Sequence, residues 1–157
     1  MAVRKIRTNP DPVLREKAKK VTSFDKSVQR LINDMVDTLD AASGVGLAAN
    51  QVGVPLRIVV IQMPDEDALV LVNPEIIEKK GERQVVEGCL SIPGYQAEIK
   101  RANSVKVRAR NREGKICKLT AKDLKSQALE HEIDHLNGIL YIDYLEDDSH
   151  LVKLEPG

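Results

Sequence analysis

Two histidines four residues apart carry the clearest chemical signal in the chain. His131 and His135 bracket the segment His-Glu-Ile-Asp-His, in which Glu132 follows the first histidine directly. On an α-helix, side chains at i and i+4 project from one face about 6 Å apart, so both imidazoles can bind one metal ion. The adjacent glutamate can reach a water molecule on that ion, which indicates a metal-dependent hydrolase. The plain alternative is a solvated helix face on which these side chains pair with their neighbours.

A catalytic site of this kind needs a third protein ligand. The downstream histidine of the metzincin proteases is missing, because Tyr141 stands at its position. The remaining candidates with soft donor atoms are Cys89, Cys117 and His150. Cys89 follows a glycine that permits close approach of the backbone, whereas Cys117 lies in an expected strand and His150 in an acidic tail. An inert core thiol is the ordinary alternative for either cysteine.

A glycine-bearing loop at residues 44–51 offers a different kind of group. Its sequence, Gly-Val-Gly-Leu-Ala-Ala-Asn-Gln, does not match a dinucleotide-binding fingerprint, because Ala49 replaces the third glycine and no strand is expected before it. The loop offers exposed backbone and the amide of Gln51, which can donate a hydrogen bond to an oxyanion.

Two helices are expected to position these groups. Apolar residues recur on one helical face between residues 25 and 42. A second helix is expected to begin near Thr120, which with Asp123 resembles a capping box, and to carry both histidines. Gly138 is expected to end this helix.

Short runs rich in β-branched residues predict strands, and the segments are 57–61, 68–72, 104–110, 115–119 and, after the second helix, 139–145. Pro93-Gly94 is expected to form a turn. Two helices with several antiparallel strands between them predict an α+β fold. The length fits a single domain over residues 1–157.

Composition excludes some function classes. The 24 basic residues balance 24 acidic ones, which argues against a protein that holds nucleic acid or a membrane surface by bulk charge. No segment approaches the roughly 20 apolar residues of a membrane span, and the basic N-terminus lacks the apolar run of a signal peptide. With only two cysteines, we expect a reducing, cytoplasmic location, or an organellar stroma or matrix for a eukaryotic source.

Three segments, taken together and in this order, resemble the signature motifs of peptide deformylase. They are GVGLAANQ at 44–51, EGCLS at 87–91 and HEIDHLNG at 131–138, and the similarity extends from Arg7 to Leu145. The resemblance implies antiparallel β-sheets around a central metal-binding helix. It also implies an enzyme that removes the formyl group from the N-formyl-methionine of nascent polypeptides, releasing formate.

The resemblance implies a metal site with three ligands, Cys89, His131 and His135. One divalent ion is expected there, Fe²⁺ in the cell, and Zn, Ni or Co can take its place. Ligand softness alone favours zinc for one cysteine with two histidines.

The resemblance also implies roles for other residues. Glu132 would be the general base and acid, and the Gln51 amide and the Leu90 backbone N–H would stabilise the oxyanion. Glu87 is expected to have a structural partner such as Arg101, although a plain solvated charge is the alternative.

Substrate is expected to be held by two kinds of contact. An extended peptide would pair with backbone groups around Val45, Gly46 and Gly88, as in strand addition. An apolar pocket for the methionine side chain would be lined by Val45, Val85, Leu124 and Ala128. Ordinary core packing is the alternative for these four.

Two residues depart from the family pattern. Glu130 stands where many members carry Gln, and Gln127 stands where an apolar residue is common.

The expected partners are N-formyl-methionyl nascent peptides. Association with the ribosome is compatible with that substrate. No direct binding to nucleic acid or membrane is expected.

Two other functions compete with this interpretation. A small zinc endopeptidase would suit the His-Glu-Ile-Asp-His segment, but the missing histidine at Tyr141 counts against it. A metal-binding or ribosome-associated module without catalysis is the second alternative. Glu132 argues against that module, because metal binding does not require it.

Overall fold

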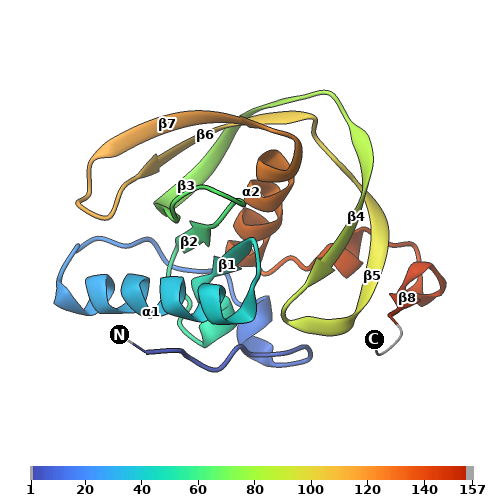
Figure 1. Cartoon of the computed structure of the whole chain (residues 1–157), viewed down its shortest axis with the longest axis horizontal. Coiled ribbons are helices and arrows are strands. Elements are labelled where there is room, and N and C mark those ends of the chain that lie inside the picture. The colour runs from blue at the N-terminus through green and yellow to red at the C-terminus, as the bar shows by residue number, and fades with distance from the viewer. Residues whose placement is uncertain (1, 155–157) are drawn as a thin grey trace.

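One helix lies between two antiparallel β-sheets in the computed structural model, which describes residues 2–154 (Figure 1). The helix is α2 (Asp123–Leu136). The larger sheet has the order β1 (Gly46–Ala48), β2 (Ile58–Ile61), β3 (Leu69–Lys80), β6 (Ser104–Arg110) and β7 (Ile116–Lys122). The smaller sheet has the order β4 (Arg83–Cys89), β5 (Ile92–Arg101) and β8 (Val152–Lys153). The predicted α+β class with a central helix is confirmed.

A second helix, α1 (Lys26–Ala42), matches the amphipathic segment of the sequence. Asp25 caps it, because its carboxylate accepts a hydrogen bond from the backbone N–H of Val28. Among the described residues, no helix has the length and apolar character needed to cross a bilayer. The short 3₁₀ turns are Pro12–Arg15, Ala49–Val52, Tyr141–Tyr144 and Asp148–His150.

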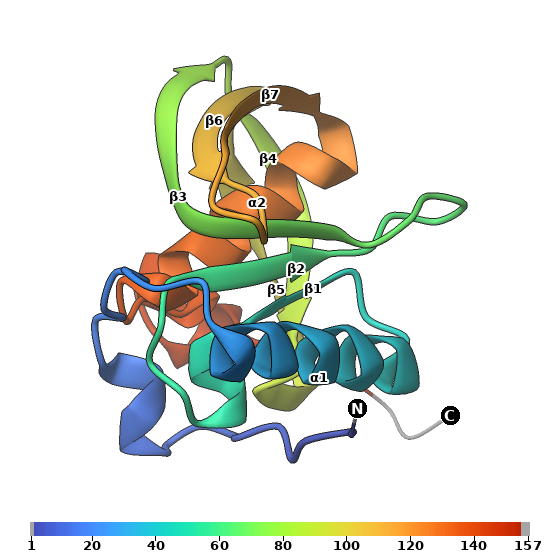
Figure 2. The ribbon, with the colours of Figure 1, turned by 90° about the vertical axis from the view of Figure 1, so that its left-hand side faces the viewer.

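Strand β2 is buried on both faces, because α1 covers one side of it and α2 the other (Figure 2). Ile58 and Val60 pack in the core cluster that contains α1. Val59 and Ile61 pack in the cluster that contains α2. The uninterrupted apolar run of this strand follows from its two covered faces.

Strand β6 is covered on one face only. Val105, Val107 and Ala109 are buried in the core cluster under α2, and the basic residues between them are more exposed. The predicted strand over residues 104–110 is therefore confirmed, and its alternation of apolar and basic residues is the pattern expected of a strand with one covered face.

The start of α2 differs from the sequence prediction. Strand β7 continues to Lys122, and Thr120 pairs with Lys106 of β6. The capping box between Thr120 and Asp123 therefore does not form, and the helix begins at Asp123 without a side-chain cap. Backbone pairing with a neighbouring strand has outweighed the local capping signal.

The β4–β5 hairpin is not indicated by the sequence pattern. The chain turns at Leu90 and Ser91, and the expected turn at Pro93-Gly94 is wrong, because both residues lie within β5. Strand β5 is held by pairing with its neighbour in the chain, β4, on one side and with β8, which comes much later in the chain, on the other.

The predicted strand over residues 139–145 is also wrong, because a 3₁₀ turn, Tyr141–Tyr144, occupies this segment. The Asp143 carboxylate accepts a hydrogen bond from the Leu140 backbone N–H and two from the Arg15 guanidinium. These polar contacts close the turn although its residues are largely apolar.

Gly138 lies just after the C-terminal end of α2 and has the left-handed backbone conformation, with φ +74°. A Cβ built on it would lie 2.6 Å from the Arg15 carbonyl oxygen. We expect Gly138→Ala to lower the free energy of unfolding by about 1–2 kcal/mol for the left-handed backbone, with a steric cost added. Gly94→Ala is the matched control, because its φ is +84° and nothing lies within 4 Å of its Cβ. Urea denaturation should show the larger loss for Gly138→Ala, and equal losses would contradict the steric argument.

Candidate metal centre

Three potential metal ligands from distant segments meet beside α2. Cys89 ends β4, and His131 and His135 lie one turn apart in the helix. Their donor atoms all lie within 4.8 Å of one another. The predicted trio is therefore brought together by the fold.

Two of the three separations between these atoms fit a single tetrahedral ion. Cys89 Sγ lies 3.3 Å from His135 Nε2, and the Nε2 atoms of His131 and His135 are 3.2 Å apart. Metal bonds of about 2.0–2.3 Å place tetrahedral ligands roughly 3.3–3.6 Å from one another. One thiolate with two imidazoles is also a donor set typical of zinc and related ions.

The other two candidates for the third ligand lie elsewhere. Cys117 is in β7 and packs against the core cluster under α2. His150 is exposed in the turn Asp148–His150. Within residues 2–154, neither belongs to the group of donors around His131.

Glu87 orients one of the histidines. Its buried carboxylate contacts His131 Nδ1. Burial pushes the pKa of Glu87 up, but the hydrogen bonds from His131 and Arg101 outweigh burial and lower the pKa to about 2. Because Glu87 is ionised, Nδ1 carries the hydrogen and donates it, which leaves the lone pair of Nε2 facing the other ligands.

Arg101 holds Glu87 in turn. Its Nε and Nη2 atoms donate to the two carboxylate oxygens at 3.0 and 2.6 Å. Its Nη1 donates to Asp134 at 2.8 Å. The expected partnership between Glu87 and Arg101 is thus a buried, two-bonded ion pair.

Glu132 faces the same space as the ligands. Its Oε2 lies 4.0 Å from His131 Nε2, and its buried Oε1 has no partner among the described protein atoms. Burial raises the pKa of Glu132 to about 7, against the opposing effect of His131. Gly46 gives this side chain room, because a Cβ there would lie 2.6 Å from Oε2.

The Gln51 amide is held in one orientation. Its Oε1 accepts a hydrogen bond from the Ala48 backbone N–H, and its Nε2 donates to Ser91 Oγ at 3.1 Å. Nε2 also lies 3.7 Å from Cys89 Sγ. Ser91 is a site residue that the sequence reasoning missed, although it closes the segment Glu-Gly-Cys-Leu-Ser.

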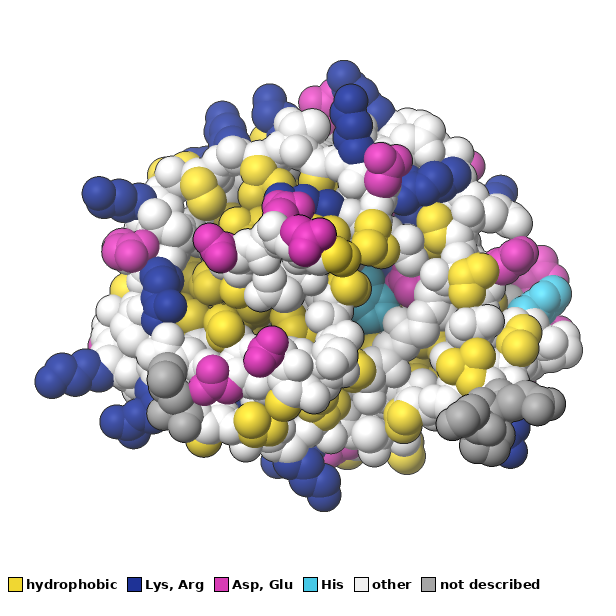
Figure 3. Space-filling model, in the orientation of Figure 1, with side chains coloured by type: hydrophobic (Ala, Val, Ile, Leu, Met, Phe, Trp, Pro, Cys, Tyr) yellow, Lys and Arg dark blue, Asp and Glu magenta, His cyan; other side chains and the backbone are white. Residues whose placement is uncertain are grey.

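A cleft of about 540 Å³ opens over these groups. Figure 3 shows histidine and carboxylate surface in a hollow bordered by hydrophobic side chains. The predicted substrate-contacting residues that line this cleft are Val45, Gly46, Gly88, Leu124 and Ala128. The predicted catalytic residues that line it are Gln51, Leu90 and Glu132.

Val85 is the exception, and its assignment to the pocket is wrong. It packs against the core cluster that contains Leu14 and Ile99, and Val86 lines the cleft instead. Successive residues of a strand point to opposite faces, so a change of one residue crosses the sheet. Because the two residues are both valines, the sequence does not indicate which one faces the cleft and which one faces the core.

Comparisons with known proteins agree with this geometry. A family model described as polypeptide deformylase matches residues 3–150. The peptide deformylase of Dehalococcoides mccartyi is 55% identical over 157 residues, which is 99% of this chain and 94% of that protein. The chain belongs to the peptide deformylase family. The peptide deformylase of Heliobacterium modesticaldum is 50% identical over 149 residues, covering 95% of this chain and 98% of that protein.

Solved peptide deformylases share the whole fold. The enzyme from Legionella pneumophila superposes with a TM-score of 0.90 at 49% identity, covering 92% of this chain and 87% of that one. The enzyme from Ehrlichia chaffeensis, in complex with actinonin, gives 0.92 at 35% identity, covering 96% and 92%. The predicted activity of the peptide deformylase family, metal-dependent removal of the formyl group from nascent peptides, is confirmed by this membership.

Both departures from the peptide deformylase pattern have partners in the fold. The Glu130 carboxylate accepts a hydrogen bond from the Ala102 backbone N–H at 2.8 Å and pairs with Lys79 at 2.9 Å. The Gln127 amide donates to the Val86 carbonyl oxygen at 3.2 Å. Glu130 therefore points away from the ligands, whereas Gln127 contributes a polar group to the cleft wall.

Glu87→Ala should lower both the stability of the fold and the affinity of the site for metal. It leaves the Arg101 cation buried without its main partner, which typically costs about 3–5 kcal/mol of stability. It also frees the His131 ring, so we expect metal affinity to fall about 10–100-fold. Thermal denaturation and zinc titration measure the two effects. Glu98→Ala, at an exposed position of β5, is the control and should change neither. An unchanged zinc affinity in Glu87→Ala would contradict the orienting role.

Proposed function

We propose that this peptide deformylase holds one divalent ion between Cys89, His131 and His135 and uses it to hydrolyse N-formyl-methionyl peptides. The observation that carries the proposal is the grouping of three donor atoms within 4.8 Å of one another, with two of their separations at 3.2 and 3.3 Å, close to those of ligands on one tetrahedral ion. An ion bound there would lower the pKa of a water molecule and polarise the formyl carbonyl.

Glu132 serves as general base and then as general acid. The partner-free oxygen of its carboxylate is available to accept the proton of the attacking water. The carboxyl group then donates that proton to the departing amine, so that one residue assists both bond formation and bond cleavage. Its position beside the donors supports catalysis over a module that only binds metal.

Gln51 and Leu90 stabilise the negative charge that forms on the formyl oxygen. The Gln51 carbonyl oxygen is occupied by the Ala48 N–H, so the amino group of the amide is directed toward Cys89 and the cleft. The Leu90 backbone N–H is the second donor, in the turn that follows Cys89. Fixed donors of this kind act without reorganisation during the reaction.

The cleft holds the peptide in two ways. Val45, Leu124 and Ala128 contact the methionine side chain, and the 44% exposure of the apolar Leu124 side chain supports a binding role. Backbone groups beside Gly46 and Gly88 pair with the extended peptide, where the absence of side chains leaves room.

Iron is the proposed ion in the cell, on the strength of the family resemblance, with Zn, Ni or Co as substitutes. The donor set suits several of these ions, so anaerobic purification followed by elemental analysis is the test. Because nascent peptides are the substrate, we place the enzyme in the cytoplasm, at or near the ribosome. For a eukaryotic source, the stroma or matrix of an organelle takes that place.

Metal-loaded protein should release formate from formyl-Met-Ala-Ser. We expect Glu132→Gln to retain its metal and to lose turnover by about 10²–10⁴-fold, because the proton transfer is removed and the ligands are not. Glu98→Gln, at an exposed carboxylate, should keep full activity. Cleavage of internal peptide bonds without formate release would favour an endopeptidase instead.

Gln51→Ala should lower kcat about 10²–10³-fold, because one donor to the oxyanion is lost. Its metal content should stay near normal, since Gln51 is not a ligand. Gln51→Glu is the companion variant, because it keeps the acceptor for the Ala48 N–H and removes the amide donor. Formate-release kinetics with elemental analysis measures both, and full turnover in either variant would exclude the amide from the mechanism.

A further inference from the structure

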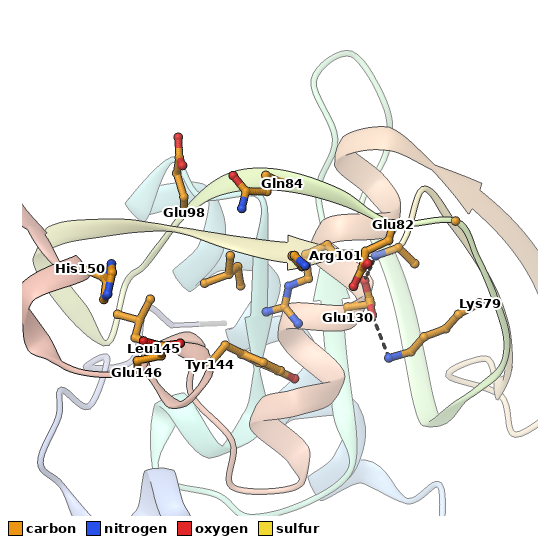
Figure 4. A pocket seen from close by; sticks show the side chains of 14 residues that line it. Lys79, Glu82, Gln84, Glu98, Arg101, Glu130, Tyr144, Leu145, Glu146 and His150 are labelled. Atoms are coloured by element: carbon orange, nitrogen blue, oxygen red, sulfur yellow. Dashed lines mark hydrogen bonds and ion pairs between the residues drawn. The ribbon is translucent and has the colours of Figure 1, made fainter.

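Tyr144 lies beside Arg101 in a second cavity, of about 660 Å³, away from the substrate cleft (Figure 4). The phenol ring covers the guanidinium, with the Arg101 Cζ atom 5.1 Å from the ring centroid. Tyr144 is 49% exposed, whereas Arg101 is 4% exposed. The more exposed aromatic ring therefore covers one face of the buried cation at the wall of this cavity.

A continuous series of polar contacts joins Tyr144 to the metal centre. The Tyr144 hydroxyl donates to Asp134 Oδ2 at 2.7 Å, and the same oxygen accepts a hydrogen bond from Arg101 Nη1 at 2.8 Å. The other edge of the guanidinium donates to Glu87. Glu87 then contacts His131 Nδ1, on the ring whose Nε2 faces the other ligands.

The planar shape of the Arg101 guanidinium explains how a contact with Tyr144 can affect the position of Glu87. Its donors lie in one plane, so the acceptors at its edges and the group over its face determine its orientation. Burial and the Asp134 carboxylate raise the pKa of Tyr144 to about 12, so the phenol stays protonated and donates at neutral pH. Asp134 is partly exposed, and the Tyr144 hydroxyl holds its carboxylate against Arg101.

Anchoring of the 3₁₀ turn does not account for Tyr144. The turn Tyr141–Tyr144 is already closed by Asp143, which accepts hydrogen bonds from Leu140 and Arg15. The Tyr144 hydroxyl points instead to α2, where its acceptor lies three residues after His131.

We propose that Tyr144 is a positioning residue of the metal centre. By anchoring Asp134 and covering Arg101, it holds Glu87 in place and so sets the orientation of the His131 ring. This inference rests on the proposed metal site.

Zinc affinity of the full chain, measured by competition with a chelator, tests the inference. Tyr144→Phe keeps the ring and removes the hydroxyl, and we expect zinc to bind about threefold more weakly. Tyr144→Ala removes both contacts, and we expect a loss of about tenfold, at the low end of the range for residues that touch a ligand directly. In zinc-loaded protein, the ¹H–¹⁵N signal of the His131 Nδ1–H should shift in both variants.

Asp143→Asn is the matched control, because it weakens the same turn through Arg15 without touching Arg101 or Asp134. It should lower Tm and leave both zinc affinity and the His131 signal unchanged. The inference is overturned if the Tyr144 variants bind zinc as tightly as the unmodified protein. An equal loss of affinity in Asp143→Asn would also overturn it, since stability of the turn would then explain the effect. If the unmodified protein binds no zinc, the metal site itself fails.

Discussion

The metal centre depends on the buried ion pair between Glu87 and Arg101. Cys89 lies on the β4–β5 hairpin and both histidines lie on α2, so the two elements must be held at a fixed separation. Glu87 and Arg101 belong to the hairpin, and their outer partners, His131 and Asp134, belong to the helix. The pair therefore joins the hairpin to the helix at the place where the thiolate meets the imidazoles.

Buried charges need complete sets of partners, and this requirement makes the join specific. An apolar contact could bury similar area but would tolerate small rotations of the helix. A carboxylate held on two oxygens by one guanidinium has a single satisfactory position. The orientation of the His131 ring is determined by that position, so the same interaction serves stability and the geometry of the ligands.

Helix α2 carries several buried polar side chains on the side that faces the hairpin and the cleft. Glu130, His131, Glu132 and His135 are all buried, together with apolar residues that pack against the larger sheet. Glu130 is satisfied by the Ala102 N–H and Lys79, and His131 by Glu87. The helix is thus enclosed by the sheet on one side and by the hairpin and the cleft on the other.

The sequence by itself determined features that depend on local geometry. The four-residue spacing of the histidines on a helix, the amphipathic α1 and the alternating β6 all follow from the periods of regular structure. The motif segments also pointed to Cys89, Gln51 and the partnership of Glu87 with an arginine. Only the tertiary structure decided that Thr120 belongs to a strand and not to the start of the helix, where the hairpin around Leu90 turns, and which of Val85 and Val86 faces the cleft. It also brought Ser91 to Gln51 and Tyr144 to Asp134. These outcomes depend on backbone pairing and side-chain packing in the folded chain, which local propensity alone does not predict.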